Sequence, residues 1–396
     1  MTSLTILQAF NYTAPLLILP YLTRILDVSE FGAVMVALAV VQVGKMMTGY
    51  GFVISATADI SKKRDDTEFV NQKIGIIFTA EILLIFLACS LLLSVSFISN
   101  YQNYQIIFFS GLGAVIAQAY QPTWLFHGLE RMKNYTIYMS ATKIFHVILV
   151  LLLVSEKGDG HWVLISWSLS NILGTIVALY MLKRLGYFIG FASLKDALCE
   201  LRTTAQYFWS RMAVVLYTSA SSIIVGAGDV SQAALFSTAE QGYMAGKSVT
   251  GPVNQAIYPF MAREKNWNMF FKILSIAIIV LIVGSTIVGY YSEFFIVMIF
   301  GVDYIKAAPI LQVFMLAIVI NYVAVCFGYP ACSAIERPDI ANKTVLFGAF
   351  VFAILVSVLF YVNQATAFNV ALVILCVEFV VMIVRVGWVL QIKRIS

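Results

Sequence analysis

Two lysines lie inside long apolar segments, 202 positions apart in the sequence. Lys45 belongs to the stretch GKMMTG at residues 44–49, and Lys247 belongs to the stretch GKSVTG at residues 246–251. A lysine within a membrane helix is energetically expensive and generally faces a bundle interior or a watery cavity. Since an ammonium group attracts anions, the pair predicts an anion-binding site between two halves of the chain.

The two lysine motifs are part of a longer internal repeat. The sequence DVS at residues 27–29 returns at residues 229–231, and Ala37 returns as Ala239, at the same offset. With the lysine motifs this gives 8 identities in a window of 23 residues. Two unrelated apolar segments would share about two. We therefore expect two copies of one unit, and a pseudo-two-fold axis that runs along the membrane normal.

The composition places most of the chain in a bilayer. Hydrophobic residues make up 61% of the 396 residues and charged residues only 11%, whereas a soluble domain carries about 25% charged residues. Twelve apolar stretches are long enough to cross about 30 Å of hydrocarbon as helices. They are residues 3–26, 31–58, 74–98, 104–125, 136–154, 161–182, 207–226, 232–259, 269–290, 307–330, 341–361 and 366–390. The expected fold is an all-α integral membrane protein with twelve transmembrane helices in two six-helix bundles.

The basic residues between these stretches predict the orientation of the chain. Eighteen lysines and arginines, Arg211 among them, fall on one side, whereas only Lys157 and Lys306 fall on the other. Basic loops stay in the cytosol, so both termini are expected there.

The one long internal connection predicts the domain boundary. We expect a first lobe at residues 1–182, a cytosolic amphipathic linker at residues 183–206 and a second lobe at residues 207–396. Ser193 and Asp196 have the spacing of a capping box, which predicts a short helix on the membrane surface. An irregular linker is the alternative.

The depth of the two lysines favours a role in substrate binding. Each lies 14 or 15 residues into its predicted span, which places it ~21–23 Å from the outer surface at 1.5 Å per residue. Side-chain snorkelling covers only a few ångström, so Lys45 and Lys247 need water, a counter-charge or an anionic substrate. The structural alternative is a buried salt bridge or a helix contact. Arg24 lies near the outer end of the first span, where it either closes the cavity or extends to the interface.

Other ionisable residues inside the predicted spans are candidates for coupling or charge balance. Glu240 precedes Lys247 by seven residues and shares its helix face, so it can balance the lysine or carry a coupling proton. Glu81 and Lys143 lie at similar depths and are expected to form an ion pair, with a transport role as the alternative. Glu378 lies near the middle of the last span.

Several classes of activity lack their motifs in this sequence. The lysine motifs lie within apolar spans and follow no strand, and neither has the G-x-x-x-x-G-K-[ST] pattern of a nucleotide-binding loop. The three histidines are far apart, so no metal cluster is expected. No nucleophile with a base and no accessible carboxylate pair is evident. The sequence therefore favours a transporter without a cofactor over an enzyme, and no nucleic-acid partner is expected.

Several short motifs resemble those of one transporter family. They are PYLTR at residues 20–24 with EFG at 30–32, QPTWLFHGLE at 121–130, Tyr258-Pro259, and FGVDYIKA at 300–307. Together with the twelve spans, they make the chain similar to Wzx-type O-antigen flippases of the MOP superfamily, which also contains the multidrug (MATE) exporters.

This resemblance implies a function for the whole chain. The substrate would be undecaprenyl diphosphate that carries an oligosaccharide unit, moved across the bacterial inner membrane by alternating access. Arg24, Lys45 and Lys247 match in kind the basic residues that line the cavity of the related lipid II flippase. Membrane lipids and other polysaccharide assembly proteins are the implied partners.

Two other functions remain as alternatives. A cation-coupled multidrug exporter would require an acidic cavity, for which Glu81, Glu240 and Glu378 are the candidates. A membrane-embedded glycan polymerase would require a substantial outer loop with acid or base groups, and the longest outer stretch, residues 291–305, is short and largely apolar.

Overall fold

The computed structural model describes residues 17–395, without the side chains of residues 210, 213, 214, 216–218, 394 and 395. The described chain is helical, and it divides into two compact units, Met1–Val215 and Leu216–Ser396. Among the described residues, eight helical segments are long and apolar enough to cross a membrane, compared with the twelve spans that the sequence predicted. Most of the first predicted span, residues 3–26, lies outside the described residues.

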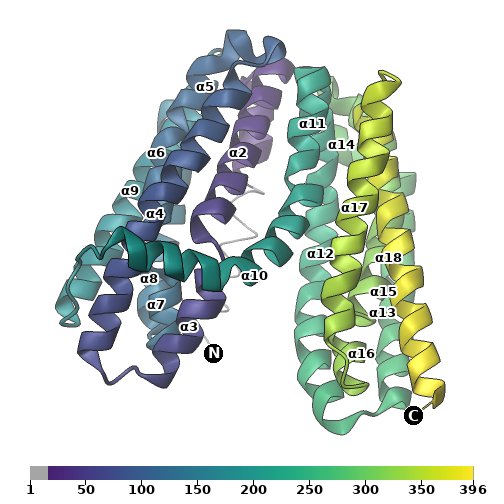
Figure 1. Cartoon of the computed structure of the whole chain (residues 1–396). Helices are drawn as coiled ribbons and strands as arrows, with labels where there is room; N and C mark the ends of the chain where they lie inside the picture. Colours follow the sequence, from purple (N-terminus) through teal and green to yellow (C-terminus); the bar gives the residue numbers. More distant parts are fainter. Residues whose placement is uncertain (1–16, 396) are drawn as a thin grey trace. The chain divides into compact units, whose positions relative to one another are not determined.

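The first unit is built around a central helix that carries Lys45. This helix, α2, contacts α4, α6 and α9, and α8 packs along α9 (Figure 1). The helices of this unit are α2 (Val28–Gly49), α3 (Phe52–Lys62), α4 (Thr67–Ser96), α5 (Gln105–Ser110), α6 (Leu112–Ala119), α7 (Thr123–Gly128), α8 (Met132–Leu153) and α9 (Gly160–Arg184). The span predicted at residues 104–125 is thus divided among three short helices, which are separated at Gly111 and at Gln121-Pro122.

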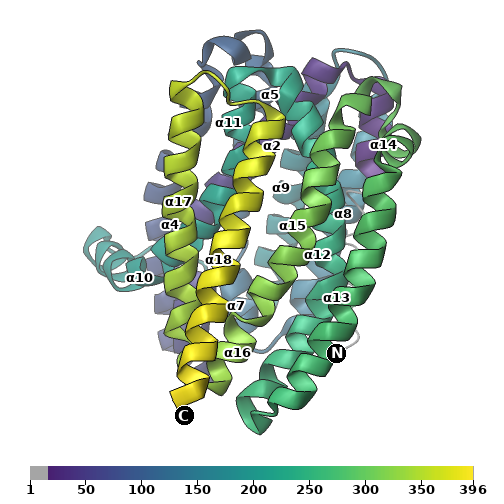
Figure 2. The ribbon, with the colours of Figure 1, turned by 90° about the vertical axis from the view of Figure 1, so that its right-hand side faces the viewer.

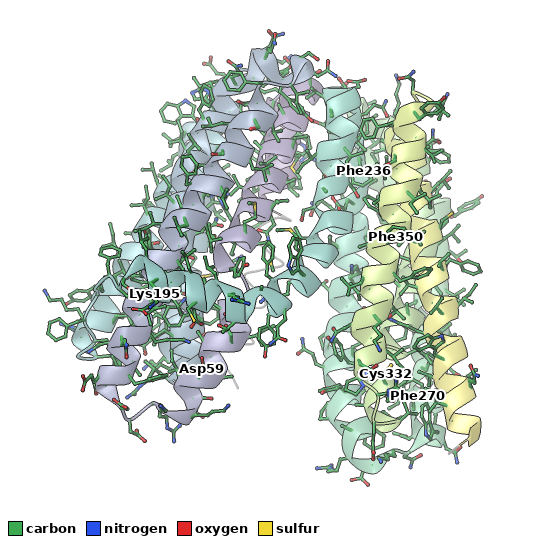
Figure 3. The ribbon with its side chains drawn as sticks, viewed as in Figure 1. Asp59, Lys195, Phe236, Phe270, Cys332 and Phe350 are labelled. Atoms are coloured by element: carbon green, nitrogen blue, oxygen red, sulfur yellow. The ribbon has the colours of Figure 1, made fainter. Side chains whose placement is uncertain are left out.

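The second unit is built around α12, which carries Lys247, and α15. The helix α15 contacts α12, α13 and α18, and α17 and α18 lie side by side (Figure 2). The helices of this unit are α11 (Ala220–Gly228), α12 (Val230–Glu264), α13 (Trp267–Tyr290), α14 (Ser292–Phe300), α15 (Ala308–Cys326), α16 (Tyr329–Ala334), α17 (Asp339–Tyr361) and α18 (Ala367–Ile395). Phe270 and Cys332 belong to one buried apolar cluster of this unit (Figure 3).

The linker helix α10 (Leu194–Thr218) is longer than the sequence suggested. The N-cap half of the capping box is present, because the Ser193 hydroxyl accepts from the Asp196 amide (3.2 Å), and it also donates to Asp196 Oδ2 (2.7 Å). The helix then continues without a break through the start of the span predicted at residues 207–226. No glycine or proline occurs between Leu194 and Thr218 that would end it.

The first part of the linker packs on the first unit through polar contacts. The Lys73 ammonium on α4 forms ion pairs with Glu200 on α10 (2.7 Å) and with Asp59 on α3 (2.8 Å). The Ala192 amide also donates to the Thr79 hydroxyl on α4 (2.9 Å). Asp59 and Lys195 mark α3 and α10 in Figure 3.

The helix that carries Lys45 ends soon after the lysine, whereas the helix that carries Lys247 continues. Tyr50 (φ 40°) and Gly51 (φ 91°) adopt left-handed backbone conformations, and they separate α2 from α3. The residues 202 positions later are Pro252 and Val253, inside the unbroken α12. Proline fixes φ near −65°, so this left-handed turn cannot form in the second copy. The span predicted at residues 31–58 is therefore two helices.

The glycines on either side of Tyr243 allow α15 to pack closely on α12. A Cβ atom built at Gly246 would lie 2.5 Å from Ile318 Cδ1, and one built at Gly242 would lie 2.5 Å from Leu311 Cδ1. This small-x-x-x-small spacing is common where membrane helices pack tightly.

A larger residue at this contact is expected to destabilise the second unit. Gly246→Leu should lower the free energy of unfolding by about 1–3 kcal/mol, because the added side chain overpacks the contact with Ile318. Gly251→Leu is the matched control, since no atom of the described residues lies within 4 Å of a Cβ at Gly251. Thermal unfolding of the purified variants in detergent measures the difference, and equal midpoints for the two variants would contradict this account of the glycines.

Candidate functional site

The first unit contains a cavity of about 130 Å³ that is lined by Lys45. Its other polar and aromatic lining residues come from five helices and from one helix connection. They are Gln42 on α2, Glu81 on α4, Gln118 on α6, Gln121 before α7, Thr123 and Trp124 on α7 and Arg211 on α10. Two cations and a carboxylate therefore share one cavity within a single compact unit.

Lys45 lies one turn before the end of α2, and its side chain is half-buried. The Thr48 hydroxyl donates to the Lys45 carbonyl oxygen at 3.2 Å. The Thr250 hydroxyl makes the same contact with the Lys247 carbonyl oxygen at 3.0 Å. The repeated sequence thus produces the same local helix geometry around both lysines.

The linker helix brings Arg211 to the cavity. Tyr50 and Phe208 stack with their ring centroids 4.5 Å apart, and the hydroxyls of Ser55 and Thr204 lie 3.1 Å apart. A Cβ at Gly51 would meet the Cβ of Tyr207 at 2.9 Å. The left-handed turn after α2 therefore provides the surface on which this part of α10 packs, one helical turn before Arg211.

Glu81 is buried in the wall of this cavity, with 1% of its surface exposed. Its Oε2 atom has no hydrogen-bond partner in the described structure, and neither has Oε1 of Gln118, which is 6% exposed. The indole N–H of Trp124, which also has no partner there, lies close enough to Glu81 to interact with it electrostatically. The ion pair expected between Glu81 and Lys143 is not formed between these two described side chains. Lys143 is half-buried and close enough to Lys45 to interact with it electrostatically.

In the second unit, Lys247 contacts the aromatic ring of Tyr243, whose hydroxyl is hydrogen-bonded to the Glu378 carboxylate. The Lys247 ammonium lies 4.8 Å from the centroid of the Tyr243 ring, which is a cation–π distance. The Tyr243 hydroxyl donates to Glu378 Oε1 at 3.2 Å. Glu240 accepts from the Ser222 hydroxyl at 3.4 Å and lies within electrostatic reach of Lys247.

Glu378 also lines a cavity of about 250 Å³ in the second unit, together with Asn321 and Arg385. Arg385 is 7% exposed, and it donates to the Thr344 hydroxyl (2.8 Å) and to the carbonyl oxygens of Ala324 (2.8 Å) and Ala341 (3.3 Å). The guanidinium thereby links α15, α17 and α18, and each buried carbonyl gains a charged donor.

Arg24 does not line the Lys45 cavity. Its side chain is exposed, and it donates to the Pro20 carbonyl oxygen one turn earlier at 2.7 Å. Of the residues that the sequence singled out, the first unit thus brings Lys45 and Glu81 into one cavity, and the second unit connects Lys247 with Glu378 through Tyr243.

Several lining residues were not recognised from the sequence. The sequence marks Arg211 only as one basic residue of the cytosolic side, and it marks Trp124, which is 2% exposed, only as part of the motif at residues 121–130. The motif QPTW at residues 121–124 was the available signal, because both Gln121 and Trp124 line the cavity. The spacing of apolar residues in this segment gives no indication that Tyr243 contacts Lys247.

A model of one protein family matches residues 1–265, which is more than half of the chain. The chain belongs to the polysaccharide biosynthesis protein family. A protein of Escherichia coli (strain K12), provisionally named an O-antigen transporter, is 29% identical over 266 residues. That region is 65% of this chain and 62% of the E. coli protein. A protein of Shigella dysenteriae with the same provisional name is 26% identical over 288 residues, 72% of each chain.

Two groups of solved structures share the fold of this family member. The lipid II flippase MurJ in an inward closed conformation has a TM-score of 0.79 at 13% sequence identity, over 97% of this chain and 87% of that chain. An inward-facing multidrug resistance transporter of the MATE family has a TM-score of 0.72 at 11% identity, over 98% and 96% of the two chains. The chain therefore has the same fold as these two transporters.

Proposed function

We propose that the protein is a flippase for lipid-linked oligosaccharides. It moves undecaprenyl diphosphate that carries an O-antigen unit from the cytosolic to the periplasmic leaflet of the bacterial inner membrane. The observation that carries the proposal is the cavity of the first unit, in which Lys45 and Arg211 both take part. Two cations in a largely apolar unit are suited to a diphosphate, because they neutralise a charge that the hydrocarbon core does not tolerate.

The proposal extends to both halves of the chain. Twelve spans in two six-helix bundles, with a linker on the cytosolic surface and both termini in the cytosol, give each lysine motif the same depth in the membrane. Lys247 then supplies a further cation for the diphosphate, and Arg24 supplies one near the outer end of the first span. Rocking of the two halves presents the head group first to the cytosol and then to the periplasm, while the polyprenyl tail stays in lipid.

The acidic residues have a supporting role in this proposal. Glu240 balances the charge of Lys247 when no substrate is bound, since Ser222 holds its carboxylate on the second unit. The hydrogen bond from the Tyr243 hydroxyl to Glu378 holds the Tyr243 ring against the Lys247 ammonium. Lys143 adds positive charge near Lys45. The protein performs no covalent chemistry in this mechanism, and other polysaccharide assembly proteins deliver and receive its substrate.

Transport by the reconstituted protein tests the proposal. Proteoliposomes would contain undecaprenyl diphosphate-linked N-acetylglucosamine, galactose or glucose in both leaflets, together with an external enzyme that modifies that sugar but cannot cross the membrane. Without flipping, about half of the sugar is modified. With the wild-type protein, we expect nearly complete modification of at least one of the three lipids. Modification that stays near half for all three, in vesicles where the protein is inserted, would refute the proposal.

A further inference from the structure

The cavity of the first unit contains groups that a site for phosphate alone does not need. Glu81 Oε2 and Gln118 Oε1 are acceptors, they are buried, and neither has a hydrogen-bond partner among the described residues. Phosphate oxygens are acceptors as well, and a carboxylate repels them. Lys45 and Arg211 therefore account for only part of the lining of this cavity.

Glu81 Oε2 and Gln118 Oε1 accept no hydrogen bond in the described structure, although Lys45, Arg211 and the unpaired indole N–H of Trp124 line the same cavity. A buried polar atom without a partner costs about 1–3 kcal/mol, and more when it is charged. A cavity of about 130 Å³ is much larger than one water molecule needs. Ordered water can satisfy the acceptors in the resting protein, and a ligand that displaces this water must bring donors of its own.

We propose that Glu81 and Gln118 form a subsite for the hydroxyl groups of a sugar, next to the phosphate-binding Lys45 and Arg211. This inference rests on the proposed function, because it assumes that a sugar diphosphate enters the cavity. The first sugar of such a lipid is bonded directly to the diphosphate. Its hydroxyls therefore reach acceptors in the same small cavity that holds the cations.

The other lining residues suit a sugar. Trp124 offers an aromatic ring, and aromatic rings pack well against the apolar face of a sugar. Gln121 is held in a fixed orientation, because its Nε2 donates to the Asn171 carbonyl oxygen (3.3 Å) and to Asn171 Oδ1 (3.1 Å). A rigid amide, a buried acid and an indole form a polar wall whose shape discriminates between sugars.

The test compares ligands with and without a sugar. Purified protein in nanodiscs would be titrated with farnesyl diphosphate and with farnesyl diphosphates that carry N-acetylglucosamine, galactose or glucose. The wild type should bind at least one sugar form about tenfold more tightly than farnesyl diphosphate, which corresponds to one or two buried hydrogen bonds. Glu81→Gln and Gln118→Leu should each remove most of this preference. Gln118→Leu should retain the affinity for farnesyl diphosphate, and Glu81→Gln should retain or raise it, because the carboxylate that repels phosphate is gone.

The cation variant separates this inference from the proposed function. Lys45→Ala should weaken the binding of every ligand by a similar factor and leave the sugar preference in place. If the wild type binds none of the ligands, both proposals fail. If it binds all of them equally, or if Glu81→Gln lowers the affinity for all of them to the same extent, only the sugar subsite is refuted. The second result would assign Glu81 to charge balance or proton binding.

Discussion

Replacement of both Lys45 and Lys247 by alanine is expected to abolish transport of the lipid-linked sugar. A hydrogen bond to a charged group contributes about 1.5–3 kcal/mol, so the loss of two such contacts should reduce the flipping rate at least a hundredfold. The variant should still insert, because removal of a charge from a membrane helix favours insertion. The proteoliposome assay measures the rate, and surface O-antigen in cells provides an independent measurement.

Two controls make this result specific. Lys133→Ala removes an exposed lysine outside the cavity, and it should leave transport unchanged. The double change of Lys45 and Lys247 to arginine keeps both charges and should retain most of the activity, apart from the difference in shape between ammonium and guanidinium. Wild-type flipping by a properly inserted double alanine variant would exclude the two lysines from the substrate site.

Lys73→Met is expected to produce the largest loss of stability. The Lys73 and Glu200 side chains are only 10% and 12% exposed, and Asp59 is the second acid of the same cluster. Removal of the lysine leaves Glu200 buried without its counter-charge, which typically costs about 3–5 kcal/mol. Thermal unfolding in detergent should show a clearly lower midpoint, and limited proteolysis should cut the linker near α10 more readily.

The pair of Lys265 and Glu336 provides the control for this prediction. Their ammonium and carboxylate are 2.6 Å apart, yet the side chains are 47% and 77% exposed. Because exposed pairs contribute about 0–1 kcal/mol, Lys265→Met should hardly change the midpoint. The combined change of Lys73 to Met and Glu200 to Leu should recover part of the loss, since no unpaired buried charge remains on the linker. Equal effects of Lys73→Met and Lys265→Met would contradict the burial argument.

The sequence was most informative where a feature depends on pattern alone. The apolar stretches predicted long helices such as α4, α8 and α17, because a membrane requires about 20 apolar residues for each crossing. The lysine motifs predicted a repeated local geometry, which the matching contacts of Thr48 and Thr250 show. The spacing of Ser193 and Asp196 predicted the helix start correctly.

The sequence was least informative where tertiary contacts decide. The break at Tyr50 and Gly51 depends on packing against Tyr207 and Phe208, more than 150 residues later. In the sequence, Arg211 is one basic residue among many. Only the packing of α10 on the first unit shows that Arg211 lines the cavity. Glu81 and Lys143 have similar depths, but depth gives no information on which helix face each occupies, so their ion pair could not be excluded beforehand.

The two copies of the repeat have become chemically unequal. Lys247 lies over Tyr243 and near Glu240, whereas the matching positions before Lys45 are Val41 and Leu38. Only the first copy, in turn, has a helix end just beyond its lysine. A hybrid built from two N-terminal halves would therefore duplicate the broken helix and lose the aromatic ring. Positions that the repeat makes equivalent in sequence therefore place their lysines in different chemical surroundings.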